Sequence, residues 1–542
     1  MHFWHLDREI PFADNQLSRL NSPPEERMRA VCKLLFIVSF IAIVSAGSAF
    51  GSAANIYITE TGSPAGNCTA NVQTPAFVTN AANWGAGGSQ IGPGTTVLFC
   101  GTFTLTTGTS LASFLGSGTS ANPITFQLDT GAVIQSPAMG SASSGAFNCS
   151  GKSYVAVDGG TNGIIQNTAN GTGLANHQAS QGLYFANCTN VVAKNLTIQN
   201  IYANLGNNSG ATDTNGVNTV DVYFTGNSTG STVSNNTLNN ARTGIFVSFD
   251  SGADASNVSI YGNTISDHGW GINVGADYAS STATGVTIHD NNISNWTNWQ
   301  FPSSTYHTDG IILYNDVTTG ALDTYSIYNN YFSGSLGAGS ATGYIACGLM
   351  STCTIFNNLM VDTGTNACYG YIWLYGHNGS DSVYNNTLVG SSAASNIAVT
   401  LGDPGPGSAT SSALTVKNNI FINVGSGLHD YQNLTSDIVA SDRNIWRTGA
   451  GAAPHMSTND STSISFATWQ SDGFDTNSVN STPSLAANYM LNVGSPAKGL
   501  GANLSSLGLP ALNLDRAGWS RSSTAAWDVG AYLFMGLSAV PH

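Results

Sequence analysis

The stretch Val233-Ser-Asn-Asn236-Thr-Leu238 returns along the chain as Ile260-Tyr-Gly-Asn263-Thr-Ile265 and as Ile288-His-Asp-Asn291-Asn-Ile293. Each copy has a β-branched residue, two further residues, Asn, one residue and an apolar residue. Further copies contain Asn330, Asn358, Asn386 and Asn419, and a looser copy surrounds Asn195. From Asn236 onward these asparagines lie 27, 28, 39, 28, 28 and 33 residues apart. A period near 28 residues, with occasional insertions, predicts a repeat architecture.

The copies have the composition of strands, with short apolar or β-branched runs followed by Asn or Gly turns. None contains a long helical stripe, which excludes helical repeats. We therefore predict an all-β fold, a β-solenoid in which each coil pairs with the next through parallel strands about 4.8 Å apart. We expect the repeated asparagines to stack on one another, and we give them no catalytic role. A β-propeller is the alternative, but its blades of about 40–45 residues are longer.

Composition limits the classes of partner. Of 542 residues only 8% are charged, and the formal net charge is −15. Because no basic run is present to displace counterions, the sequence excludes a nucleic-acid backbone as partner and disfavours anionic membrane surfaces. Hydrophobic residues make up 41% of the chain, which argues against intrinsic disorder.

An export signal is expected near the amino terminus. Residues 33–46 form a basic flank and a short apolar run, followed by small residues. The run is too short to span a bilayer and has the layout of a secretory signal, with an uncleaved anchor as the alternative. Because Met28-Arg29 would make a normal signal start, we expect residues 1–27 to be an over-extended gene start. No second apolar stretch approaches spanning length, so we expect a secreted or surface protein.

Eight cysteines are present, and Cys32 falls in the signal. The seven that remain leave at least one unpaired thiol. Cys68 and Cys100 are placed to staple the amino-terminal segment, and Cys149 and Cys188 are expected to be neighbours on adjacent coils. No CxxC pair suggests a metal site.

The two ends of the repeat carry a family resemblance. Residues 93–103 resemble a first strand, and residues 121–126 with 131–134 resemble the next coil, of the secreted bacterial right-handed parallel β-helix proteins of the pectate-lyase-like superfamily. Residues 465–470, 494–497 and 527–532 resemble the closing segment of such chains. The resemblance covers roughly residues 55–534. It implies the fold; the superfamily holds lyases, hydrolases, epimerases, adhesins and inert scaffolds, so it does not imply one activity.

The expected organisation has four parts. Residues 1–54 are the leader and signal peptide, and 55–110 are an amino-terminal cap with the first strand and a short covering helix over 77–84. Residues 111–445 are the coils, and 446–542 are a carboxyl-terminal cap. Caps are needed because open ends expose unpaired strand edges.

A column of carboxylates is predicted on the strands that follow the repeat asparagines. The segments 244–250, 271–277 and 310–316 align residue for residue and place Asp250, Asp277 and Asp316 at one position of three consecutive coils. Like charges this close raise one another's pKa or recruit a cation, and oxygen-rich columns suit Ca²⁺. The alternative is that each Asp opens the following turn.

A second column precedes the same strands. It aligns the segments 241–243, 268–270 and 307–309, so that His268 and His307 share one position and Trp270 and Asp309 another. Arg242 lies in the first of these segments. A histidine pair beside Asp and Arg can supply a general acid or base near neutral pH. The alternative is a set of polar residues in a solvated turn.

An insertion between Asn291 and Gly310 adds 11 residues and concentrates aromatic side chains beside His307. Aromatic faces stack on sugar rings, and long loops in a regular solenoid are usually functional. The expected substrate-binding residues are Trp270, Trp296, Trp299, Tyr306 and Tyr314. The alternative is a local hydrophobic lid.

The segment His307-Thr308-Asp309-Gly310 resembles the Asn-Thr-Asp-Gly segment of the pectin-hydrolysing glycosidases of the superfamily, which implies that Asp309 is catalytic. The Asp-Asp, Gly-His-Gly and Arg-Ile-Lys segments of those enzymes are absent from this chain. We therefore predict a polysaccharide hydrolase or lyase that is monomeric and acts on an extracellular glycan. Asp309 is the expected acid or base, His307 or His268 its counterpart, and Arg242 a neutralising cation. A non-catalytic glycan-binding or structural surface protein is the alternative.

Overall fold

The computed structural model describes residues 55–171, 174–202, 218–278, 280–296, 307–315, 320–336, 341–349, 351–364, 368–375, 379–391, 396–402, 413–430, 438–459 and 462–536. These belong to one compact unit, Ala53–His542. The predicted leader and signal, residues 1–54, lie outside the described residues.

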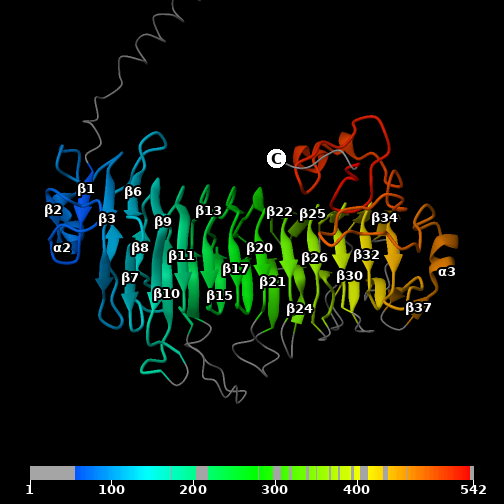
Figure 1. Ribbon diagram of the computed structural model, residues 1–542, viewed down its shortest axis with the longest axis horizontal. Coiled ribbons are helices and arrows are strands. Elements are labelled where there is room, and N and C mark those ends of the chain that lie inside the picture. The colour runs from blue at the N-terminus through cyan, green and yellow to red at the C-terminus, as the bar shows by residue number, and fades with distance from the viewer. Residues whose placement is uncertain are drawn as a thin grey trace, which may run out of the picture. The chain divides into compact units, whose positions relative to one another are not determined.

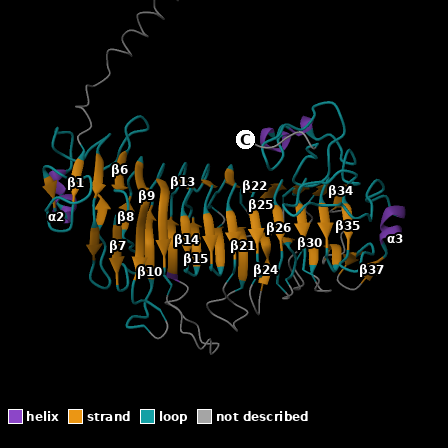
Figure 2. Cartoon of the chain, in the orientation of Figure 1, coloured by secondary structure: helices purple, strands orange, loops and turns teal. Residues whose placement is uncertain are grey.

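The chain winds into a right-handed parallel β-helix, as predicted (Figure 1). Most coils contribute three short strands, and each strand pairs in parallel with its counterpart on the next coil (Figure 2). Thr232, Ser259 and Thr287, for example, stand side by side on three successive coils. The strands form three rows, two of which join into one sheet in the described part of the chain.

The first row contains β1 (Ile56–Ile58), β3 (Thr96–Phe99), β6 (Ile124–Leu128), β13 (Thr232–Ser234), β16 (Ser259–Tyr261), β19 (Val286–His289), β22 (Asp323–Tyr328), β25 (Ser351–Phe356), β28 (Ser382–Tyr384), β31 (Leu414–Lys417) and β34 (Ile438–Asp442), with β2 (Val72–Gln73) beside β1. The second row contains β4 (Thr102–Thr104), β7 (Val133–Ser136), β14 (Thr237–Asn239), β17 (Thr264–Ser266), β20 (Asn292–Ser294), β23 (Tyr331–Ser333), β26 (Leu359–Val361), β29 (Thr387–Val389), β32 (Ile420–Ile422) and β35 (Ile445–Arg447). The strands β9 (Val155–Asn167) and β11 (Val192–Gln199) run through both rows.

The third row is a separate sheet, and it carries the candidate site. Its strands are β5 (Ala112–Phe114), β8 (Phe147–Ser150), β10 (Ser180–Ala186), β12 (Thr219–Thr225), β15 (Thr243–Ser248), β18 (Trp270–Ala276), β21 (Thr308–Asn315), β24 (Ala341–Cys347), β27 (Ile372–Leu374), β30 (Ile397–Leu401), β33 (Ser426–Asp430), β36 (His455–Asn459) and β37 (Thr462–Ile464). All pair in parallel except β36 with β37.

A buried ladder of asparagines forms the corner between the first two rows. The Asn263 side-chain oxygen accepts hydrogen bonds from the backbone N and the side-chain amide of Asn236, at 3.0 and 2.9 Å. The same two bonds recur from coil to coil up to Asn444. The predicted stacking is therefore confirmed.

Three details of the ladder were not predicted from the sequence. The left-handed backbone belongs to the residue before each ladder asparagine, such as Asn235 at φ 57°. The looser copy at Asn195 is such a residue, at φ 58°, and Leu196 occupies the ladder position and donates its N–H to Asn236. The ladder also continues one coil further than expected, to Asn444. The sequence pattern missed this coil because Ser441, three residues before Asn444, is not β-branched.

Apolar side chains from all three rows fill the interior as one cluster that extends from Ile56 to Trp469. Disulfides join Cys68 to Cys100 and Cys149 to Cys188, which confirms both expected pairs. A third disulfide, Cys347–Cys353, was not predicted. Cys368 is the unpaired thiol among the described cysteines, and it is buried.

The chain ends depart from the regular coil. The short helix expected over 77–84 appears as α2 (Pro75–Thr79) followed by a 3-10 turn, Ala81–Asn83. Helix α3 (Phe466–Ser471) follows the last strand. Residues 497–534 then run back along the outside of the coils (Figure 1), with 3-10 turns at Ser505–Leu507 and Pro510–Asn513. The Asn418 amide donates to the Ala502 carbonyl there at 2.9 Å. No helix in the described residues has the length and apolar composition needed to cross a bilayer.

Candidate functional site

The site stands where three neighbouring strands of the third row begin. Register places Thr243, Trp270 and Asp309 side by side on β15, β18 and β21, which confirms the predicted alignment of Trp270 with Asp309. Backbone hydrogen bonds connect the residues at the start of these strands: Gly269 N donates to the Arg242 carbonyl at 3.1 Å, and Asp309 N donates to the Gly269 carbonyl at 3.0 Å. Residues separated by 27 to 67 positions in the chain therefore share one corner of the coil.

Arg242 is buried within this corner, with 2% of its surface exposed. Its guanidinium carbon lies 3.9 Å from the centre of the Trp270 ring system, a cation–π contact. One of its nitrogens, Nη2, donates to the His307 carbonyl at 3.5 Å. A Cβ at Gly269 would lie 2.3 Å from Arg242 Nη1, so a larger residue there would displace the guanidinium. Arg242 thus supports Trp270 and His307 from behind and contributes a positive charge, but it does not reach the surface as a substrate contact.

His307 and Asp309 form a hydrogen-bonded pair through Nδ1 and Oδ2. Asp309 is fully buried, whereas the His307 side chain is 24% exposed. The Trp296 indole N–H donates to the Asp309 carbonyl at 2.7 Å and fixes the backbone of the pair. The expectation that Asp309 itself is the acid or base is wrong, because a side chain with no exposed surface cannot touch a polysaccharide. His307 is the accessible member, and Asp309 can orient it.

His268 faces the interior and pairs with a residue that the sequence interpretation missed, Asp221 on β12. His268 Nε2 and Asp221 Oδ2 lie 2.7 Å apart, and both side chains are at most 1% exposed. Burial raises the pKa of Asp221 to about 6, and the neighbouring His268 opposes that rise. The proposed acid–base role of His268 is therefore wrong; the pair is an internal polar contact. The sequence holds no signal for this residue, because Val220-Asp221-Val222 matches the ordinary apolar–polar alternation of a strand and predicts an outward-facing Asp221.

The carboxylate column is confirmed as far as the structure describes it. Asp277 N donates to Asp250 Oδ1 at 2.8 Å, so the two residues are neighbours on successive coils. Burial, and secondly the charge of Asp250, raise the pKa of Asp277. Asp316 lies outside the described residues.

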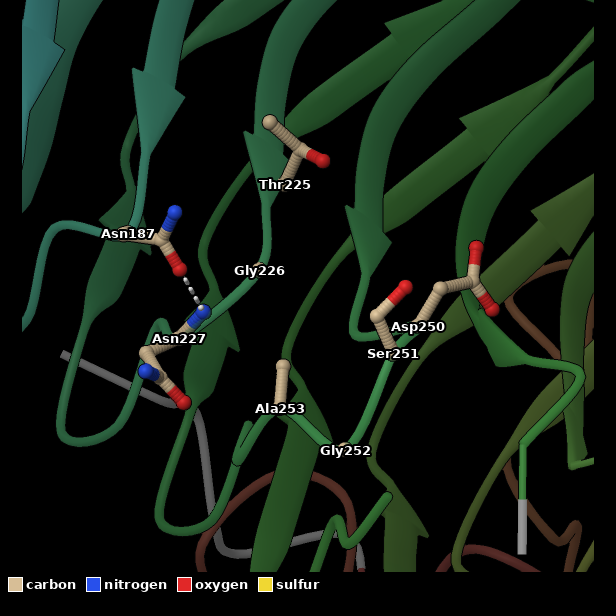
Figure 3. A pocket seen from close by; sticks show the side chains of 8 residues that line it. All are labelled: Asn187, Thr225, Gly226, Asn227, Asp250, Ser251, Gly252 and Ala253. Atoms are coloured by element: carbon tan, nitrogen blue, oxygen red, sulfur yellow. Dashed lines mark hydrogen bonds between the residues drawn. The ribbon is translucent and has the colours of Figure 1, made fainter. Parts of the chain in front are cut away.

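The surroundings of Asp250 do not build the predicted calcium site within the described residues. Asp250 borders a hollow of about 280 Å³ that is lined by Asn187, Thr225, Gly226, Asn227, Asp250, Ser251, Gly252 and Ala253 (Figure 3). Its carboxylate points away from Asn187 and Asn227 and accepts from the Ser248 hydroxyl at 3.0 Å. In the part of the chain that the structure describes, no group of three His, Cys, Asp or Glu side chains gathers to hold a metal ion.

The expected sugar-binding aromatics divide into three groups. Trp296 is 6% exposed and belongs to the interior cluster, so its assignment to the substrate surface is wrong. Trp299 and Tyr306 lie outside the described residues. Trp270 and Tyr314 are partly exposed, and the Tyr314 ring lies over Gly275, where a Cβ would come within 2.2 Å of it.

Comparisons with known proteins found no matching family model and no matching curated sequence. Solved structures do match. An alginate lyase from Paenibacillus sp. str. FPU-7 is 13% identical with a TM-score of 0.34, over 70% of this chain and 95% of its own. The surface adhesin PfbA of Streptococcus pneumoniae is 15% identical with a TM-score of 0.42, over 63% of this chain and 81% of its own. An exopolygalacturonase from Thermotoga maritima is 10% identical with a TM-score of 0.37, over 67% of this chain and 81% of its own. At such scores the activities of these proteins do not transfer to this chain, whose own strand register shows a parallel β-helix.

Proposed function

We propose that this protein cleaves an acidic extracellular polysaccharide by β-elimination, with His307 as the base. The observation that carries the proposal is the pairing of the partly exposed His307 with the fully buried Asp309. An imidazole exchanges protons near neutral pH, and a carboxylate on one ring nitrogen fixes the tautomer and stabilises the protonated ring. His307 would exchange its proton through Nε2, the nitrogen that Asp309 does not hold.

Elimination suits this arrangement better than hydrolysis. Glycoside hydrolysis commonly needs two carboxyl groups on opposite sides of the scissile bond. The carboxylate that contacts His307, Asp309, is fully buried, so it cannot flank a sugar. Elimination needs one base, which removes the proton from the carbon next to the sugar carboxylate. The electron pair of that bond forms a ring double bond, the bond to the glycosidic oxygen breaks, and that oxygen takes up a proton.

The remaining parts of the corner fit the same reaction. Trp270 lies beside His307, with ring centres 5.7 Å apart, and offers an aromatic surface to a sugar ring. Arg242 behind Trp270 supplies positive charge at a site for an anionic sugar. We also propose that the protein is exported, since its substrate lies outside the cell. We further propose that it acts as a monomer.

The experiment is incubation of the purified chain with polygalacturonate, alginate and neutral glycans, with and without Ca²⁺. Ultraviolet absorbance of unsaturated sugar ends and a reducing-end assay follow the products. His307→Ala should abolish product formation. His289→Ala is the matched control, because His289 also pairs with an aspartate, Asp290, at 2.7 Å but lies in the first row.

Three outcomes separate the hypotheses. Unsaturated ends that vanish in His307→Ala support the proposal. Reducing ends without unsaturated ends would instead indicate hydrolysis. Binding without any product would favour the alternative of a non-catalytic glycan-binding protein, and both of these results overturn elimination.

A further inference from the structure

Three aromatic side chains stack on one another on and beside β27, and the proposed reaction does not use them. The ring centres of Tyr369 and Trp373 lie 5.4 Å apart with 15° between the ring planes, and those of Trp373 and Tyr375 lie 4.4 Å apart with 29° between the planes. The indole N–H of Trp373 donates to the Gly402 carbonyl at 2.9 Å and fixes the middle ring. These three residues, the aromatic stack, therefore form one ordered surface.

The aromatic stack lies on the outer side of the third row. The chain neighbours of Trp373, which are Ile372 and Leu374, both belong to the interior cluster, so the Trp373 side chain points outward. Tyr369 is 47% exposed, and Trp373 and Tyr375 are partly exposed. Aromatic surface left in water contributes nothing to folding, because the stabilisation comes from the apolar area that is buried. Exposed apolar surface that the fold nevertheless keeps ordered is characteristic of a binding site.

The aromatic stack begins at the same corner of the coil as the candidate site. Register places Asp309 beside Gly343 on β24, and a Cβ at Gly343 would lie 2.1 Å from the carbonyl oxygen of Gly370 on the next coil. Tyr369 directly precedes Gly370, so it lies two coils along the axis from the pair of His307 and Asp309. Because coils are about 4.8 Å apart, this separation is about 10 Å along the axis, a length that a short oligosaccharide spans.

The chemistry of the aromatic stack suits the ring of a sugar rather than its carboxylate. Aromatic rings offer apolar surface to the C–H groups of a sugar ring, and such rings commonly line ligand sites. Tyrosine and tryptophan offer no ion pair to an anionic group. The positive charge of this corner is instead supplied by Arg242, which donates to the His307 carbonyl. The two places therefore differ in what they hold: the reacting acidic unit lies at His307, and a further unit of the same chain is held by its ring at the aromatic stack.

We propose that the aromatic stack is a second subsite for the polysaccharide and binds a sugar unit remote from the bond that is cleaved. This inference rests on the proposed function of the site at His307. A chain long enough to reach both places gains the contact with Tyr369, and a shorter chain does not. The protein should therefore prefer long chains to short ones. The aromatic stack should lower KM and leave kcat unchanged, because it contacts a unit that does not react.

The test measures unsaturated sugar ends from dimers and hexamers of galacturonate and of alginate. A dimer has only the two units on either side of the cleaved bond, so it cannot reach the aromatic stack. The wild type should cleave the hexamer with a kcat/KM at least about tenfold higher than that for the dimer. Tyr369→Ala should raise the KM for the hexamer about tenfold and leave kcat unchanged. Tyr369→Phe keeps the ring and should behave as the wild type does.

The matched control is Tyr278→Ala. Tyr278 is 49% exposed and follows β18, whereas Tyr369 precedes β27, so the two tyrosines lie at opposite ends of the parallel strands of the row. This control should leave the KM for the hexamer unchanged. A hexamer KM in Tyr369→Ala equal to that of the wild type, or an equal rise in the control, would overturn this inference alone. Wild-type protein that makes no unsaturated ends from either hexamer would overturn the proposed function and the inference together.

Discussion

Replacing Asn291 with alanine tests how the coils are held together. Asn291 is 1% exposed, and its side-chain oxygen accepts from Asn263 N at 3.1 Å and from the Asn263 amide at 2.9 Å. Its own amide donates to the Ile260 carbonyl and to Asn330, each at 3.0 Å. One side chain thus completes the hydrogen bonds of three successive coils.

Alanine removes the acceptor of two buried donors of Asn263 and the donor to Ile260. At about 1–3 kcal/mol for each buried group left unpaired, and with partial relaxation, we expect a loss of about 3–6 kcal/mol. The substitution should also speed amide hydrogen exchange on the coils of Asn263 and Asn330, because each coil depends on its neighbours.

Denaturant unfolding, together with hydrogen exchange read by mass spectrometry, measures both effects. Asn292→Ala is the matched control: it is the next residue, it is exposed, and it should change stability by less than about 0.5 kcal/mol. If Asn291→Ala lay within about 1 kcal/mol of this control, the ladder would not carry the structural role assigned to it.

Three further predictions concern buried titratable groups. Burial raises the pKa of Asp323 from 3.8 to about 6, so ionisation of its carboxyl group should lower the free energy of unfolding as pH rises through this window, by about 3 kcal/mol at neutral pH. Asp323→Asn still offers an oxygen to Ala283 N and should remove this decline, as measured by denaturant unfolding at several pH values. A pH profile of stability equal to that of the wild type would contradict the prediction. His268→Ala leaves Asp221 buried without its partner and should cost about 3–5 kcal/mol in chemical denaturation, whereas a loss below about 1 kcal/mol would show that the pair is not needed. Burial raises the pKa of the Cys368 thiol, so iodoacetamide should label it only after unfolding, and rapid labelling of the native protein would refute its burial.

The sequence predicted the fold because the asparagine period is a direct record of the register. Asn263 and Asn291 lie 28 residues apart in the chain and hydrogen-bond in the structure. The prediction failed at Asn195, where the pattern was matched one residue early. Consecutive asparagines serve two roles in this coil, a left-handed turn and a ladder position, and composition alone does not distinguish them.

The site was predicted in position but not in the roles of its residues. Register aligned Trp270 with Asp309 correctly, because alignment follows from the period. Whether a side chain at a corner points inward or outward depends on local backbone bends, which is why the buried Asp309 and His268 were taken as accessible groups. Asp221 was missed because an insertion precedes its strand and hides the period there.

The most direct test of the account is the rate at which Asp309→Asn produces unsaturated sugar ends. We predict a folded protein that binds polysaccharide as the wild type does and reacts roughly 10²–10⁴-fold more slowly, because an amide at this position presents a donor to His307 Nδ1 and leaves the wrong tautomer for proton removal. A rate equal to that of the wild type would contradict the assignment of Asp309 as the residue that positions His307.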